Sequence, residues 1–410
     1  MTYIVLSLLF LCLGLLREKG LLPFLTLIAC LPFSNSFSIY FYQYGLYSYD
    51  YFFFGVLIST SISGIATKAN VINVPKWATI SFLIIATYSV IPVFSGTSLD
   101  VYFLRDYRPA IFALELIAAS LLLRSRKLQL SSRNILTIAT LAGATNLIWL
   151  ALSIAGVMSS EDEYYTTNNF KYFDASTYIS ALFIIYFFSK AKAHRHPERK
   201  LAFNLRQTLA ITASLLSVIL SGYRILAFAT IIAAALAAAK SPKKLIPIVI
   251  ILAISSLIFI YLAEYFGAAR VAEGLTASGL LQQLSTRYGP ALDVISSFKP
   301  YNYLFGSGFG TSFDITWFEY RSLDTRNNFV DSAYITFFAK YGLLGILYIT
   351  SITLSLLSLV PKPIKLSLLA YLLILFIAYA ISYQPASAGI IIGCMIVRIL
   401  QSNSDSAAKI

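Results

Sequence analysis

Long apolar segments recur along the whole chain and constrain its fold more than any other feature. Most are about 17–25 residues long, the length that a helix needs to cross a hydrocarbon core of about 30 Å. Only 12% of the 410 residues are charged, about half of the roughly 25% found in soluble domains. Strands of a membrane β-barrel would alternate apolar and polar residues instead. The pattern excludes a soluble enzyme, a nucleic-acid module and a disordered chain, and predicts an all-α polytopic integral membrane protein.

The apolar segments predict about 13 transmembrane helices with the N-terminus outside the cytoplasm. In this orientation most Lys and Arg residues fall in short cytoplasmic loops, as is usual for membrane proteins, and this topology rather than nucleic-acid binding accounts for the net charge of +13. The predicted spans are 2–16, 20–36, 48–67, 77–94, 109–123, 134–157, 175–190, 207–222, 224–239, 245–264, 332–359, 366–382 and 386–400.

One connection is far longer than the others. Residues 265–331 form an outer loop rich in Tyr, Phe, Leu and Gly, and long loops of this kind are usually functional or disordered. The loop separates an N-terminal transmembrane bundle, 1–264, from C-terminal transmembrane helices, 332–410. Apolar residues at helical spacing predict an amphipathic helix on the outer membrane surface, with Gly289 and Pro290 interrupting its first turn. These apolar residues are Leu284, Tyr288, Leu292, Ile295 and Phe298.

Two arginines stand out at the outer side. Arg224 ends the sequence Ser-Gly-Tyr-Arg between two predicted spans, where it is either a snorkelling residue at a tight helical hairpin or a guanidinium offered to an anionic lipid head group. Arg287 is either an ordinary surface residue of the loop helix or a second ligand for the same anion. Because acidic and basic residues balance in the loop, any recognition of an anion there depends on individual arginines.

Two acidic residues have similarly open interpretations. Asp331 precedes a long predicted helix, where it is either the N-cap or a general base. Glu115 lies inside a predicted span, where it is either a functional group or a protonated helix contact. The glycine-rich residues 304–311 indicate a tight turn or backbone amides that approach a ligand, and they lack the flanking strand and helix of a dinucleotide site.

Three segments in this order resemble the O-antigen polymerase and O-antigen ligase superfamily of bacterial envelope glycosyltransferases. They are SGYR at Ser221–Arg224, the Arg287 segment leading into LFGSGFGTS at 304–312, and DSAYITFFAKYGLLG at Asp331–Gly345. The resemblance covers about residues 205–350. It implies an inverting glycosyltransferase without metal or cofactor, which acts on undecaprenyl-diphosphate-linked glycans at the periplasmic face of the bacterial inner membrane.

The resemblance also implies residue roles and partners. Arg224 and Arg287 would hold the diphosphate, and Asp331 would accept a proton from a sugar hydroxyl. Ligases have His-Asn where this chain has Asp331-Ser332, which favours a polymerase. The expected partners are the lipid-linked oligosaccharide, membrane lipid, a chain-length regulator and a flippase. The expected substrate-binding residues are Tyr223, Tyr288, Arg270, Tyr303, Trp317, Arg321 and Arg326.

Three alternatives remain at this stage. A ligase would use the same chemistry with another acceptor. A flippase or other transporter would usually show paired repeats and polar groups at the membrane midplane, whereas the chain has no evident repeat. A scaffold of an export complex would need no chemistry at all.

Overall fold

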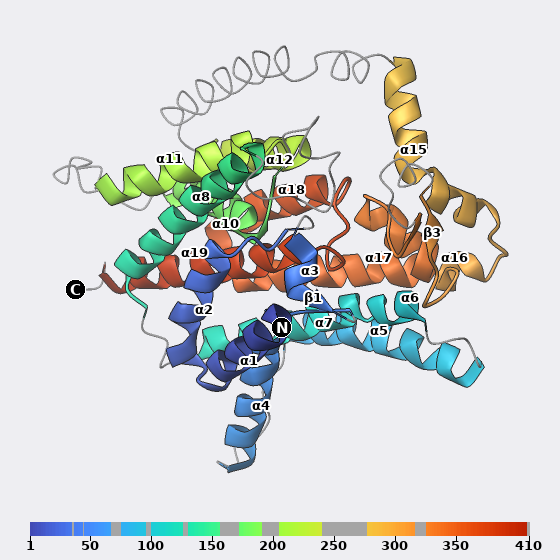
Figure 1. Cartoon of the computed structure of the whole chain (residues 1–410), viewed down its shortest axis with the longest axis horizontal. Coiled ribbons are helices and arrows are strands. Elements are labelled where there is room, and N and C mark those ends of the chain that lie inside the picture. Colours follow the sequence, from blue (N-terminus) through green and yellow to red (C-terminus); the bar gives the residue numbers. More distant parts are fainter. Residues whose placement is uncertain are drawn as a thin grey trace.

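The structure, a computed structural model, is mostly helical (Figure 1), as predicted. It describes residues 1–34, 37–43, 45–66, 75–95, 100–125, 130–155, 172–190, 205–239, 277–315 and 325–407. The N-terminal elements are α1 (Thr2–Leu15), α2 (Glu18–Cys30), α3 (Ser38–Phe41), β1 (Tyr42–Gln43), β2 (Leu46–Tyr47), α4 (Asp50–Ala66), α5 (Lys76–Ser95), α6 (Val101–Arg105), α7 (Arg108–Arg124), α8 (Ser132–Ile154) and α10 (Ala175–Lys190).

The C-terminal half adds further helices and a second short antiparallel pair of strands, β3 with β4, to the pair of β1 with β2. Its elements are α11 (Leu205–Leu220), α12 (Arg224–Ala238), α15 (Ala277–Ser296), α16 (Asn302–Phe305), β3 (Phe313–Asp314), β4 (Arg326–Asn327), α17 (Ala333–Leu359), η3 (Lys362–Ile364), α18 (Lys365–Leu375), η4 (Pro385–Ser387) and α19 (Ala388–Ala407).

The expectation of about 13 spans is wrong for the part of the chain that the structure describes. Three helices there are long and apolar enough to cross a membrane: Ser132–Leu152, Ala333–Leu359 and Pro385–Asn403. Predicted span 245–264 lies outside the described residues. The shorter apolar helices are Thr2–Leu15, Asp50–Ser63, Lys76–Val90, Ala175–Ser189, Arg206–Leu220 and Arg224–Ala238.

Several predicted spans fail because the backbone leaves the helix inside an apolar run. The segment 20–36 is helical only to Cys30, since Leu31 is extended before Pro32, and a residue before proline disfavours the α-conformation. The segment 366–382 is helical only to Leu375. Hydropathy measures apolar length and does not detect these ends.

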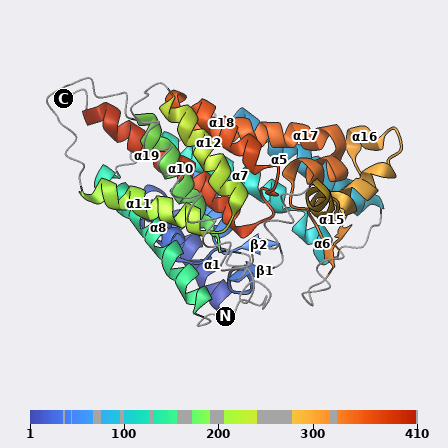
Figure 2. The same cartoon turned by 90° about the horizontal axis from the view of Figure 1, so that it is seen from above.

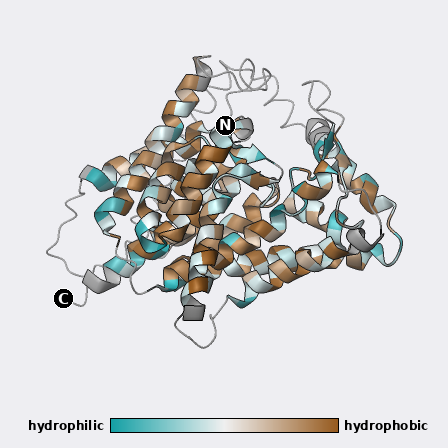
Figure 3. Cartoon of the chain, turned by 60° about the horizontal axis from the view of Figure 1, so that its bottom comes forward, coloured by the Kyte–Doolittle hydropathy of each residue, from teal (hydrophilic) through white to brown (hydrophobic). Residues whose placement is uncertain are grey.

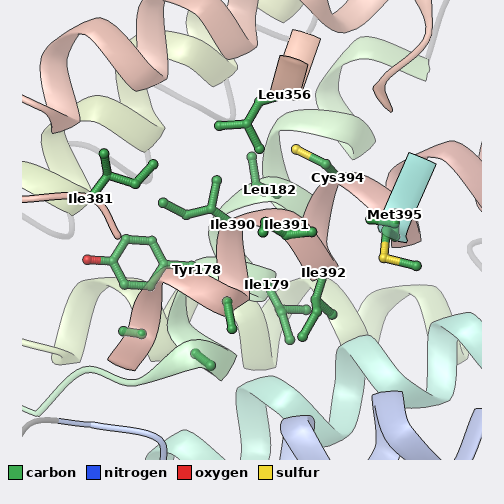
Figure 4. Packing of buried hydrophobic residues seen from close by; sticks show 14 of the residues in the cluster. Tyr178, Ile179, Leu182, Leu356, Ile381, Ile390, Ile391, Ile392, Cys394 and Met395 are labelled. Atoms are coloured by element: carbon green, nitrogen blue, oxygen red, sulfur yellow. The ribbon is translucent and has the colours of Figure 1, made fainter. Parts of the chain in front are cut away.

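The helices enclose one large hydrophobic core. Figure 4 shows part of it, where Ile390 and Ile391 of α19 lie close to Tyr178 and Leu182 of α10 and to Leu356 of α17. Hydrophobic residues predominate along many helices (Figure 3), and some large ones, such as Leu83 and Phe228, are exposed. A helix that is apolar all round is typical of a protein interior or a membrane.

Helix α15 confirms the predicted helix in the long loop, but it runs without interruption through Gly289 and Pro290. Ala291 on its inner face is buried against a small cluster that includes Phe313 and Val330. This packing holds the helix together although proline lacks an N–H donor.

Helix α17 contains a backbone break that the glycine-rich loop fills. Gly342 adopts φ 59° and ψ −141° inside the helix, so carbonyls before it lose their helical donors. Donors from other elements replace them. Ser307 N donates to Ala339 O at 2.9 Å, Gly308 N to Lys340 O at 2.8 Å and the Tyr88 hydroxyl to Tyr341 O at 3.2 Å. The glycine-rich residues therefore form a structural turn, and these amides are occupied.

The break also brings two backbones into direct contact. A Cβ added to Gly342 would lie 2.6 Å from the carbonyl carbon of Leu304, and one added to Gly306 would lie 2.2 Å from that of Lys340. Both glycines have positive φ, which other residues rarely adopt. Helix α16 is thereby fixed beside one end of α17 (Figures 1 and 2).

We predict that Gly342→Ala lowers the free energy of unfolding by about 3 kcal/mol or more, because the new methyl group meets backbone at a strained φ. Thermal unfolding in detergent measures the loss. Gly289→Ala is the matched control, since a Cβ there meets nothing within 4 Å and should leave stability unchanged or slightly raised. Equal melting temperatures for the two variants would contradict the role given to the break.

A buried ion pair ties α17 to the turn between α6 and α7. Lys340 and Asp106 are both fully buried, and the ammonium group donates to the carboxylate. Asp106 also accepts from Gly310 N at 2.6 Å and from Asn328 Nδ2 at 2.7 Å. Lys340 donates a second bond, of 2.9 Å, to Asn328 O. The Asp106 carboxylate thus binds the loop at two places, at Gly310 before β3 and at Asn328 after β4.

Lys340→Ala should destabilise the protein by about 3–5 kcal/mol, because it leaves the Asp106 carboxylate buried without a cation. Resistance to proteolysis and thermal unfolding would report the change. Lys299→Ala, at an exposed position, should stay within about 0.5 kcal/mol of the wild type. A wild-type melting curve for Lys340→Ala would show that the pair is dispensable.

Candidate active site

The carboxylate of Asp331 is available for a site because its neighbour caps the helix. Ser332 is the N-cap of α17, with its hydroxyl facing Ile335 N, so the interpretation of Asp331 as the N-cap is wrong. Asp331 instead accepts a bond of 2.9 Å from Arg287 Nη1 of α15. The side chain of Arg287 is 47% exposed and that of Asp331 is 32% exposed. The pair therefore lies at an accessible surface.

Arg224 lies at the start of α12. Gly222, with φ 67°, allows a tight turn between α11 and α12. Arg224 is the first residue of α12 and is exposed. The side chain of Tyr223, the N-cap residue, makes no capping hydrogen bond, and the amides and dipole of a helix N-terminus favour a bound anion.

The two arginines and the carboxylate lie close enough to interact. Burial lowers the pKa of the Arg224 guanidinium, and the positive charge of Arg287 lowers it further. Burial raises the pKa of the Tyr288 hydroxyl, the charge of Asp331 raises it further and that of Arg287 lowers it. Arg224, Arg287 and Asp331, distant in sequence, thus lie near one another. Among these three residues, two are cations and one is an anion.

Three consecutive carbonyls after α18 hold this site together. Carbonyls at and just beyond a helix C-terminus have no partners within the helix. Here the carbonyls of residues 376–378 each accept a hydrogen bond from a different element. The donors are next to or within two residues of Asp331, Arg287 and Arg224 in sequence. Ala333 N donates to Phe376 O at 3.0 Å, the Tyr288 hydroxyl to Ile377 O at 3.0 Å and the Tyr223 hydroxyl to Ala378 O at 2.5 Å.

These bonds change the roles expected for two tyrosines. Tyr223 is buried, and its ring stacks on Phe173 at 4.4 Å between centroids. Its hydroxyl and that of Tyr288 are both bound to backbone. Both side chains therefore position the adjacent arginines, and their hydroxyl donors are already used. That either residue binds substrate stays a prediction.

The other predicted substrate-binding residues are placed elsewhere or are not described. Tyr303 is exposed on α16, with its ring edge against Phe298. Arg326 of β4 lies over the ring of Tyr102 at 4.3 Å and faces Asp100 at 3.9 Å. Arg270, Trp317 and Arg321 lie outside the described residues. Within those that are described, His, Cys, Asp and Glu form no group of three that could hold a metal ion.

Sequence reasoning missed the carbonyls of residues 376–378 because these residues lie inside the predicted span 366–382. The only signal is the polar run Ser382-Tyr383-Gln384-Pro385 between apolar stretches. Proline and polar residues in such a place indicate a broken helix.

A model of DUF6369, a family of unknown function, matches residues 21–131 and 117–409. The chain belongs to the DUF6369 family. No curated protein and no solved structure matches it. The three charged residues of the site all lie in the second matched range of this DUF6369 protein.

Tyr223→Phe should lower the free energy of unfolding by about 1–3 kcal/mol, because it leaves the carbonyl of Ala378 without its donor. Thermal unfolding of the purified protein in detergent would measure this. Tyr301→Phe, at a residue 59% exposed, is the control and should melt with the wild type. If both variants melt together, the carbonyl bonds do not hold the site.

Proposed function

We propose that this protein is a membrane-embedded glycosyltransferase that polymerises a lipid-linked surface polysaccharide. It would transfer a growing glycan from undecaprenyl diphosphate to a sugar hydroxyl of another lipid-linked repeat unit. The observation that carries the proposal is the meeting of Arg224, Arg287 and Asp331 at one accessible place.

The cationic part of the site suits a diphosphate. Guanidinium groups match phosphate oxygens with their planar fork of donors. Arg224 and Arg287 repel each other, and an anion between them would relieve that repulsion. The start of α12 adds a favourable dipole. A ligand with two adjacent negative groups uses all three features.

The carboxylate supplies the base once the donor is bound. An exposed ion pair is worth about 0–1 kcal/mol, so a diphosphate can draw Arg287 away from Asp331 at little cost. Asp331 then accepts the proton of the acceptor hydroxyl, whose oxygen forms a bond to the anomeric carbon. The bond from that carbon to the diphosphate oxygen breaks, and the arginines stabilise the charge of the leaving group. A single displacement inverts the anomeric configuration.

The surroundings suit a substrate with an apolar tail. Phe228, one helical turn after Arg224 on α12, is 55% exposed, and Ile377 beside the anchoring carbonyls is 51% exposed. Residues four apart share a helix face, so charged and apolar surfaces adjoin at the site. The resemblance to the polymerase and ligase superfamily supports a location in the bacterial inner membrane, with the site facing the periplasm.

Purified protein supplied with lipid-linked repeat units should form polymer, and Arg224→Ala, Arg287→Ala and Asp331→Asn should each slow it by about a hundredfold or more. Electrophoresis of labelled product measures the rate. Lys299→Ala and Asp293→Asn change similar charges at exposed positions and should retain full activity.

Full activity of Arg224→Ala and Asp331→Asn would exclude this site. Product formed only with an acceptor other than the lipid-linked repeat would identify a ligase. Movement of the lipid across vesicles without any product would identify a flippase.

A further inference from the structure

Three ionisable side chains form a second, fully buried cluster. Arg108, at the start of α7, donates from Nη1 to Asp50 Oδ2 at 2.5 Å, and its Nη2 lies 3.5 Å from Glu115 Oε1. The side chains of Asp50 and Glu115 are 0% exposed and that of Arg108 is 1% exposed. With both acids ionised, this cluster would carry one uncompensated negative charge in an apolar interior, which costs several kcal/mol.

Several carboxylate oxygens of this cluster also lack hydrogen-bond donors among the described residues. Asp50 Oδ2 accepts from Tyr47 N at 2.7 Å as well as from Arg108. Asp50 Oδ1 and both oxygens of Glu115 have no donor among the described residues. Asp50 and Glu115 face the same guanidinium, Asp50 at Nη1 and Glu115 at Nη2. Two carboxylates cannot bond to each other, but a carboxyl and a carboxylate can.

We propose that Asp50 and Glu115 share one proton and form, with Arg108, an electrically neutral proton-binding site. The proton lies on Glu115 and is donated to Asp50 Oδ1, so that one proton both cancels the excess charge and satisfies unpaired oxygens. This is one of the alternatives that the sequence left open for Glu115, with Asp50 now identified as its partner.

Tyrosines from neighbouring elements interact electrostatically with the cluster and are neutral near pH 7. They are Tyr3, Tyr42, Tyr47, Tyr49, Tyr348 and Tyr379. One of them, Tyr42, also interacts with the cation Arg105.

The proton-binding site also supports the segment that anchors the active site. Arg108 Nε donates to Ser382 O at 3.2 Å, and the tyrosines beside Asp50 extend the contact: the Tyr47 hydroxyl donates to Tyr383 O at 2.9 Å and the Tyr49 hydroxyl to Pro385 O at 3.0 Å. Ser382 has φ 76°, a strained conformation for a residue other than glycine. Neutral Glu115 leaves Arg108 paired with Asp50 and able to hold this backbone.

Infrared spectroscopy of the full-length protein near pH 7 tests the shared proton. The wild type should show the carbonyl stretch of a protonated carboxyl group, and E115Q should lose that band while remaining folded, since glutamine mimics a protonated glutamate. D50N should lose it too, because Glu115 then becomes the only counter-ion of Arg108. The absence of the band in the wild type, or its persistence in E115Q, would overturn the proposal.

A stability measurement gives a second readout. The folded wild type holds a proton that the unfolded chain releases above about pH 4.3, so the folded state binds more protons and stability falls as the pH rises. Between about pH 5 and 8, the unfolded-to-folded ratio should rise up to about tenfold per pH unit more steeply in the wild type than in E115Q. Asp293→Asn, at an exposed position, should keep the wild-type slope. Equal slopes for wild type and E115Q would overturn the proposal, whatever the glycosyltransferase assay shows.

Discussion

Backbone carbonyls between α18 and α19 must find donors in an apolar environment, and the rest of the structure is arranged around this need. Residues 376–384 leave the helical conformation although most of them are buried. An unpaired buried carbonyl costs about 1–3 kcal/mol, and non-helical backbone at membrane depth is tolerated only where protein surrounds it. The donors come from two sides: the candidate active site binds the first carbonyls, and the buried Asp50–Arg108–Glu115 cluster binds later ones.

This arrangement separates the residues that position the arginines from the charged residues that we propose contact a substrate. Tyr223 and Tyr288 are fixed to backbone, and each holds an arginine next to it in sequence. Arg287 and Asp331 remain exposed and joined only by a weak surface ion pair. A site built in this way is preorganised. Its ion pair between Arg287 and Asp331 is weak, so an anion that binds Arg287 displaces Asp331 at little cost.

Sequence reasoning succeeded where the signal is local and failed where it depends on contacts. Apolar runs predicted helices, and helical spacing predicted the helix of the long loop, which is present as α15. Gly306 and Gly342 were visible separately in the sequence, but only their contact explains both. Each glycine leaves out a Cβ that would meet backbone where the two segments cross. Lys340 lay unnoticed in a predicted span because its partner, Asp106, is distant in sequence.

The sequence by itself determined the helical class, the apolar surfaces and the kind of charged residue available to a site, because composition and periodicity set which faces avoid water. The tertiary structure alone decided where helices end and that Ser332, rather than Asp331, caps α17. It also decided which carboxylates form ion pairs and which of their oxygens lack a hydrogen-bond donor. These outcomes depend on hydrogen bonds and close backbone approaches between distant segments, and no local pattern of residues encodes them.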